Sequence, residues 1–184
     1  MSRTTETHLL TFEEFERMPE KPGKQELIDG ELIEMPPAKD KHNQRSLLIY
    51  DTLKAAVTAA HARGEAAELG EVRHEAGYKL AGRWLQPDVS ITHPGQTADV
   101  DDYLQGAPAI AIEVISRHQR ARDLARKTQL YFENGAREVW HLYQELRYMV
   151  IYSGGESQVR VEHESVSTPL LPGFTLILQE ILGE

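Results

Sequence analysis

The sequence predicts an α/β protein of the α+β type, with a central mixed β-sheet flanked by helices. Helical and strand-like periodicities alternate along the chain, which favours such a layered arrangement. One apolar run, residues 109–115, has the composition of a central strand that is covered on both faces. The length of 184 residues, with 40% hydrophobic and 27% charged residues, is typical of a globular chain. We therefore expect residues 1–184 to form a single domain.

The N-terminal part predicts a short helix followed by a β-hairpin. Thr11 and Glu14 form the pattern of a capping box, so a helix should begin there and end near Pro19. Two alternating runs within residues 26–35 flank Asp29-Gly30, a dipeptide that favours a two-residue hairpin turn.

A long helix is expected from Asp40 to about Arg63, where Gly64 follows as a stop signal. Its apolar residues recur at helical spacing, and His42 lies on the same face in the first turn. Beyond it, strands are expected around residue 72, at 78–80 and, as one run, at 84–91. A polar loop, 93–105, should precede the apolar strand 109–115.

The C-terminal part predicts a second helix at residues 119–134, ended by Gly135. Strands should follow at 138–143 and 148–152, with a turn at 153–155. The tail from 159 to 181 should hold a strand, a proline-bounded loop and a short final helix.

Two acidic residues lie in unusual surroundings. Glu113 is in the middle of the apolar strand, where a carboxylate must be paired, protonated or bound to a metal. Asp88 lies in another strand bounded by apolar residues, and the two can converge if these strands are neighbours. The alternative is purely structural: Asp88 caps a strand end and Glu113 forms an ion pair with an arginine.

Lys127 falls within the apolar arc of the second predicted helix, so we expect it to point inward, toward Glu113. Taken alone, a lysine at such a position is more simply explained as one whose apolar stem packs on the protein while its ammonium group reaches water. Together with Asp88 and Glu113 it favours another interpretation. Two carboxylates suit Mg²⁺ or Mn²⁺, and a nearby lysine can orient a water molecule or stabilise charge on a phosphate.

Four stretches of the sequence, taken together with their order and spacing, resemble the Uma2 family of restriction-type endonucleases, a branch of the PD-(D/E)XK superfamily. The resemblance covers residue 11 to the C-terminus, and no single stretch is specific by itself. It implies a restriction-endonuclease-like core and hydrolysis of phosphodiester bonds. The stretches are Glu26–Met35, Pro87-Asp88-Val89-Ser90, Ile112–Ser116 followed by Lys127, and Tyr131-x-x-x-Gly135 leading to Glu138-Val139-Trp140.

The resemblance also assigns roles to residues. It implies that Asp88 and Glu113 are metal ligands for Mg²⁺ or Mn²⁺. The strand carries Glu113-Val114-Ile115 in place of Glu-x-Lys, which points to Lys127 as a lysine that has moved to the next helix. The resemblance places the early acid of the family at Glu26, near the metal. His42 and Ser116 match positions of the family and are accessory candidates, although His42 can equally make only a local hydrogen bond in the first helical turn, and Ser116 can cap the helix. Arg120 is a third accessory candidate, because it lies on the same side of the helix as Lys127.

The net charge of −9 is the observation that fits a nucleic-acid enzyme least well, because phosphate binding usually needs a basic surface. DNA is nevertheless the favoured substrate over RNA, and a homodimer is expected because cutting two strands favours paired sites. A catalytically inactive interaction module on the same fold is the main alternative. A glycosidase ranks last, because a carboxylate pair for glycosides leaves Lys127 unexplained.

No stretch approaches the ~20 apolar residues of a membrane span, and the first residues lack the apolar run of a signal peptide. There is no cysteine, which excludes thiol catalysis and zinc–thiolate sites and fits a reducing compartment. We therefore expect a cytoplasmic protein without membrane contact.

Overall fold

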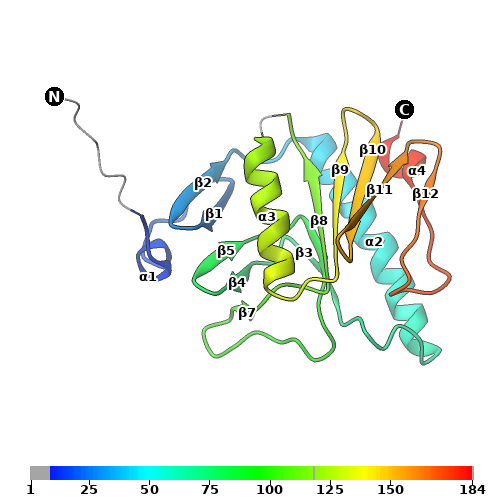
Figure 1. Cartoon of the computed structure of the whole chain (residues 1–184), viewed down its shortest axis with the longest axis horizontal. Coiled ribbons are helices and arrows are strands. Elements are labelled where there is room, and N and C mark those ends of the chain that lie inside the picture. The colour runs from blue at the N-terminus through cyan, green and yellow to red at the C-terminus, as the bar shows by residue number, and fades with distance from the viewer. Residues whose placement is uncertain (1–8, 118, 184) are drawn as a thin grey trace.

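The computed structural model describes residues 9–117 and 119–183. Its strands form two main sheets and one small ribbon, with helices packed against them (Figure 1). The expectation about a signal peptide concerns residues 1–8 and lies outside the described residues. Within the described part, no helix combines the length and apolar character needed to cross a membrane.

The smaller sheet contains the predicted hairpin and has the strand order β2-β1-β5-β4-β7. The short helix α1 precedes it and has both hydrogen bonds of the predicted capping box: Thr11 Oγ1 accepts from Glu14 N–H, and Glu14 accepts from Thr11 N–H. The element bounds are α1 (Phe12–Glu16), β1 (Lys24–Ile28), β2 (Glu31–Met35), β4 (Tyr78–Leu80), β5 (Arg83–Leu85) and β7 (Leu104–Gln105).

The hairpin turn has the conformation that its sequence predicts. Asp29 and Gly30 both have positive φ, 50° and 83°, and Ile28 pairs with Glu31 directly across the turn. A Cβ on Gly30 would come within 2.7 Å of Leu9, so only glycine fits there without displacement. The Asp29 carboxylate also accepts hydrogen bonds from Arg83 and Arg126, each with an Nε–O distance of 2.6 Å. The turn is thereby tied to both its own sheet and helix α3.

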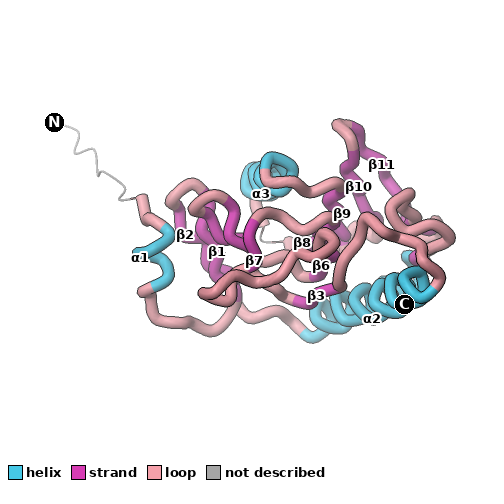
Figure 2. Tube along the Cα trace, turned by 90° about the horizontal axis from the view of Figure 1, so that it is seen from below, coloured by secondary structure: helices cyan, strands magenta, loops and turns pink. Residues whose placement is uncertain are grey.

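The larger sheet has the order β11-β10-β9-β8-β6-β3, and β8 and β9 are its parallel pair. Helices α2 and α3 lie on opposite faces of it (Figure 2). Ile110, Ile112 and Val114 of β8 pack in the core beside α2, and Ala111 packs in the core beside α3. The bounds are α2 (Asp40–Ala62), β3 (Val72–His74), β6 (Val89–Ile91), β8 (Ile110–Ile115), α3 (Ala121–Glu133), β9 (Glu138–Tyr143), β10 (Tyr148–Ser153) and β11 (Glu156–Val161).

The prediction of one strand over residues 84–91 is wrong. The run divides into β5 and β6, which belong to different sheets. Pro87, between them, has no backbone N–H to donate to a ladder, and Gln86 N–H donates to the Glu26 carboxylate rather than to a strand. This break moves the chain from the small sheet to the large one just before Asp88.

Other differences concern element ends. Helix α3 begins at Ala121 rather than residue 119, and β11 begins at Glu156 rather than 159. The predicted loop 93–105 ends in β7, which pairs in parallel with β4. The tail adds the ribbon β12 (Ser165–Val166) and β13 (Leu176–Ile177) before the expected final helix, α4 (Leu178–Leu182).

Replacing Asp29 by asparagine should destabilise the fold slightly and in a pH-dependent way. Asparagine keeps the positive φ, but the ion pairs with Arg83 and Arg126 are lost. Because Asp29 is 40% exposed, we expect only about 0.5–1 kcal/mol. The hydrogen bond from Arg126 contributes most to lowering the Asp29 pKa, to about 2. The stabilisation is therefore present above pH 4 and lost as pH falls toward 2.

Urea unfolding of both proteins at pH 7 and pH 3 measures this difference. Asp102→Asn is the matched control, because Asp102 also has a positive φ, of 64°, and forms no ion pair within the described part of the chain. Equal midpoints for Asp29→Asn and the original protein at pH 7 would show that the turn is not anchored by its arginines.

Candidate active site

The strand pairing brings Asp88 and Glu113 together. Strands β6 and β8 are antiparallel neighbours, with Val89 opposite Ile112, which meets the condition for the two acids to converge. Asp88, one residue before β6, therefore lies beside Glu113, and its Oδ2 accepts a 2.6 Å hydrogen bond from Val114 N–H. Ile112 and Val114 face the core beside α2. Because successive residues of a strand point to opposite faces, the Glu113 side chain between them projects toward α3. Both carboxylates are buried, with 5% and 1% of the residue exposed.

Lys127 points inward from α3, as its helical position predicts. Its Nζ lies 2.7 Å from Glu113 Oε1 and 2.9 Å from Glu26 Oε1, and the residue is 3% exposed. Burial lowers the pKa of Lys127, but the Glu113 and Glu26 carboxylates outweigh it and hold the pKa above its usual value. The alternative of a lysine with its charge in water is therefore wrong for this residue.

Glu26 and Tyr131 complete the buried part of the cluster. Glu26, in β1, is 1% exposed and accepts from both Lys127 and the Gln86 N–H. Tyr131, one turn after Lys127 on α3, donates from its hydroxyl to Glu113 Oε1 at 2.8 Å. Burial, with the nearby Glu113 charge, raises the pKa of this hydroxyl well above its usual value, so it stays a donor. Tyr131 was predicted only as part of a motif, not as a partner of Glu113.

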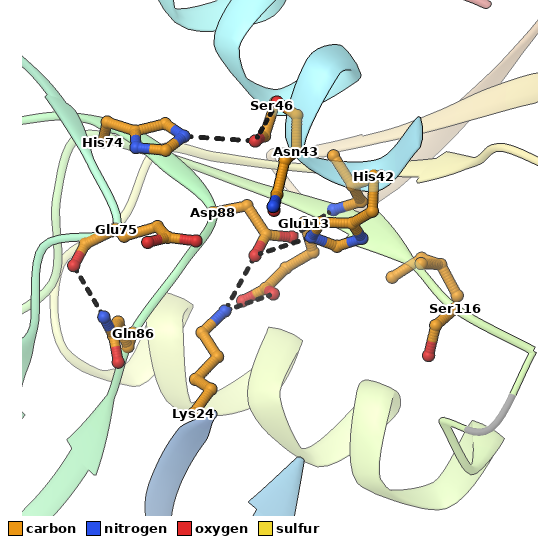
Figure 3. Close-up of polar contacts among 12 residues, drawn as sticks. Lys24, His42, Asn43, Ser46, His74, Glu75, Gln86, Asp88, Glu113 and Ser116 are labelled. Atoms are coloured by element: carbon orange, nitrogen blue, oxygen red, sulfur yellow. Dashed lines mark hydrogen bonds and ion pairs between the residues drawn. The ribbon is translucent and has the colours of Figure 1, made fainter. Parts of the chain in front are cut away.

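Lys24 is a site residue that sequence reasoning missed. It begins β1, and its Nζ lies 2.9 Å from Asp88 Oδ1 and 3.9 Å from Glu113 Oε2 (Figure 3). The only available signal was its spacing from Glu26: residues i and i+2 of a strand share a face. The ion pair of Glu113 is thus with lysines, not with the arginine that the structural alternative supposed.

His42 also reaches the site, from the first turn of α2. Its Nε2 lies 3.4 Å from Asp88 Oδ1 (Figure 3). Burial opposes ionisation of Asp88, but the charge of Lys24 and the contact with His42 outweigh it, so its pKa lies well below the usual range. Asp88 is therefore an anion in the folded protein.

Five residues of the cluster line a pocket of about 940 Å³ that the hairpin and the first turns of α2 and α3 enclose: Lys24, Glu26, His42, Asp88 and Lys127. Glu113 is buried beside Asp88. Ser116 and Arg120 line this pocket, but neither side chain contacts the acids. Ser116 points away from them in Figure 3, and α3 has no side-chain cap, so Ser116 does not cap it. Arg120 is exposed and forms no ion pair among the described residues, whereas Arg117 pairs with Glu145 at 3.0 Å.

The donor set suits a divalent cation with few protein ligands. Within residues 9–117 and 119–183, no three His, Asp or Glu side chains converge as a metal site. Asp88 and Glu113 do converge, and Glu113 Oε2 is a buried atom without a hydrogen-bond partner. Two carboxylates and free positions for water are what Mg²⁺ prefers. Glu26, held by Lys127, is not placed as a third ligand.

Comparisons with known proteins identify related molecules. The family model for Uma2, described as "Putative restriction endonuclease", matches residues 12–179. A solved structure from Anabaena variabilis, described as a putative nuclease belonging to DUF820, superposes with a TM-score of 0.79 at 17% identity. The match covers 94% of this chain and 97% of that one, so the two share a fold. Among curated proteins there is no match.

Replacing Lys127 by methionine should destabilise the protein strongly. The substitution keeps the apolar stem but leaves Glu26 and Glu113 buried without this charge, which typically costs about 3–5 kcal/mol. Arg122→Met on the same helix is the control, because Arg122 is 75% exposed in its side chain. Urea unfolding of the two variants provides the measurement. Equal, small losses would show that Lys127 is not buried in the acid cluster.

Proposed function

Because the chain belongs to the Uma2 family, we propose that the pocket is the active site of an endonuclease that hydrolyses DNA phosphodiester bonds with Mg²⁺ or Mn²⁺. The observation that carries the proposal is the convergence of Asp88 and Glu113 from paired strands, with Asp88 lining an open pocket and Glu113 buried beside it. Buried charges are costly, and a structural role alone does not explain why such a pair of carboxylates lies at the pocket.

Asp88 and Glu113 would hold the metal. When bound, the ion would polarise a phosphoryl oxygen and lower the pKa of an attacking water molecule. Val114 N–H and His42 orient the Asp88 carboxylate, and Lys127 with Tyr131 fixes Oε1 of Glu113. That arrangement leaves Glu113 Oε2 facing Lys24 as an acceptor without a hydrogen bond. The proposed metal site is therefore supported by the groups that hold the Asp88 and Glu113 carboxylates in fixed orientations.

Lys127 and Glu26 act behind this pair in the proposed mechanism. Lys127 is shared between Glu113 and Glu26, so its positive charge offsets both buried acids. Lys127 thus assists the reaction chiefly by positioning, and Glu26 positions Lys127.

The pocket offers a route for a phosphate backbone in spite of the net charge of −9. Four cationic residues line its mouth: Lys39, Arg117, Arg120 and Arg122. Arg120 is not occupied by a carboxylate of the described chain, so it is available to bind phosphate. We infer DNA rather than RNA from the family description as a restriction endonuclease, and a homodimer because two strands need two sites.

The alternative function is a non-catalytic interaction module on the same fold. The acidic net charge favours it, as does the Lys24 ammonium group between the two carboxylates. The two functions differ in metal binding, which a module of this kind does not need. Calorimetric titration with MnCl₂ separates them: heat that Asp88→Asn or Glu113→Gln abolishes supports the enzyme, and the absence of binding supports the module.

Purified protein should cleave plasmid or single-stranded DNA in Mg²⁺ or Mn²⁺ and not in EDTA. Asp88→Ala and Glu113→Ala should each lower the rate by about 100-fold or more, because each removes a group that acts on the transition state. Gel electrophoresis of timed samples measures this. Asp102→Ala is a surface control that should cut at the original rate. Cleavage that persists unchanged in Asp88→Ala would come from a contaminating nuclease and would overturn the proposed site.

Arg120→Ala should weaken DNA binding without destabilising the fold. One lost phosphate contact reduces the slope of log K against log salt by about 0.9 for duplex DNA. Fluorescence anisotropy with a labelled duplex at several salt concentrations, in Ca²⁺ or EDTA, gives this slope. Arg160→Ala on β11 is the control, because within the described part of the chain the Arg160 guanidinium donates to Val159 and Gln158 of its own strand. Identical slopes for Arg120→Ala and the control would exclude Arg120 from the DNA contact.

A further inference from the structure

The position of Lys24 is unusual for a lysine beside a proposed metal site. Its ammonium group lies between Asp88 Oδ1, at 2.9 Å, and Glu113 Oε2, at 3.9 Å. These are the two carboxylates that would hold the metal, and Figure 3 shows the side chain reaching up from β1 into the space between them. A monovalent cation of the protein itself thus lies where a divalent cation would bind.

Lys24 and Lys127 contact different oxygens of the same carboxylate. Lys127 is fixed on Oε1 of Glu113, together with the Tyr131 hydroxyl, and its side chain is 3% exposed. Lys24 faces Oε2, which has no hydrogen-bond partner among the described residues, and its side chain is 17% exposed. Both lysines line the pocket, but Lys127 is fixed by two carboxylates and almost fully buried, whereas Lys24 is the more exposed of the two.

We propose that Lys24 occupies the cation position of the metal-free protein, and that a divalent ion displaces its ammonium group into the pocket. The inference rests on the proposed function in that Asp88 and Glu113 are taken as the metal ligands. A divalent ion held by both Asp88 and Glu113 would have to enter the space between them that the ammonium group now occupies, 2.9 Å from Asp88 Oδ1 and 3.9 Å from Glu113 Oε2. Repulsion between the two cations is strong in a partly buried site.

Lys24 can both stabilise and leave the site. Without a cation, Asp88 and Glu113 would be two buried like charges side by side, which is costly. A lysine has a flexible stem and a compact charge, so it can withdraw by rotation of its side chain. Breaking the contacts of Lys24 costs free energy, which lowers the affinity of the site for metal. The same contacts stabilise the fold when no metal is bound.

Lys24→Met should therefore bind Mn²⁺ about tenfold more tightly than the original protein, a coupling of the usual size between two ligands of one site. Isothermal calorimetry with MnCl₂ measures the affinity. Thermal unfolding in EDTA and in Mn²⁺ provides a second readout: the variant should melt lower in EDTA and gain more from Mn²⁺. Lys21→Met is the matched control, because Lys21 is half exposed and, among residues 9–117 and 119–183, its ion pair is with the exposed Glu34.

The outcomes separate this inference from the proposed function. Equal or weaker Mn²⁺ binding by Lys24→Met overturns the inference and leaves the metal site intact. Binding that survives Asp88→Asn in either background places the metal elsewhere and overturns the proposed site, and with it the inference. Absence of binding in both proteins does the same.

A second measurement uses the unsubstituted chain, in case Lys24→Met does not fold. A crystal soaked in MnCl₂ should show anomalous density between Asp88 and Glu113, with Lys24 Nζ beyond hydrogen-bond distance of Asp88. Manganese bound there while Lys24 keeps its present contact would overturn the displacement. A manganese peak at another place would overturn the proposed site.

Discussion

The neutralisation of buried carboxylates is the constraint on which the arrangement depends. Asp88, Glu113 and Glu26 are each at most 5% exposed, and desolvated anions persist only with cations close by. The cations come from elements far apart in sequence: Lys24 from the hairpin and Lys127 from α3. Hairpin, central sheet and α3 are therefore held in one relative position by charge, as much as by the apolar packing of the two cores.

The parts of the fold that the sequence predicts are those with a local physical cause. The capping box at Thr11, the Asp29-Gly30 turn and the stop at Gly64 depend only on neighbouring residues. The apolar run 110–115 marked β8 as central because burial on both faces removes alternation. Within the candidate site, the inward direction of Lys127 followed from helical spacing. The convergence of Asp88 and Glu113 was conditional on their strands being neighbours, and the structure meets that condition.

What the sequence could not predict depends on contacts between distant residues. Lys24 lies 64 residues from Asp88, and an alternating strand with a lysine at its start carries no signal of such a contact. Residues 84–91 are continuous in β-propensity, so the change of sheet at Pro87 depended on tertiary pairing rather than local preference. Arg120 and Ser116 were accessory candidates by position alone, and their side chains do not contact the acids.

The separation of 101 positions between Glu26 and Lys127 along the chain has a consequence for protein synthesis. A ribosome adds about 5–20 residues per second, so roughly 5–20 seconds pass after Glu26 is made before Lys127 exists. Until then the acids of the hairpin and of the central sheet lack the helix that fixes them. If the chain cuts DNA, a nascent polypeptide that has not yet reached Lys127 lacks a group that holds the proposed site together.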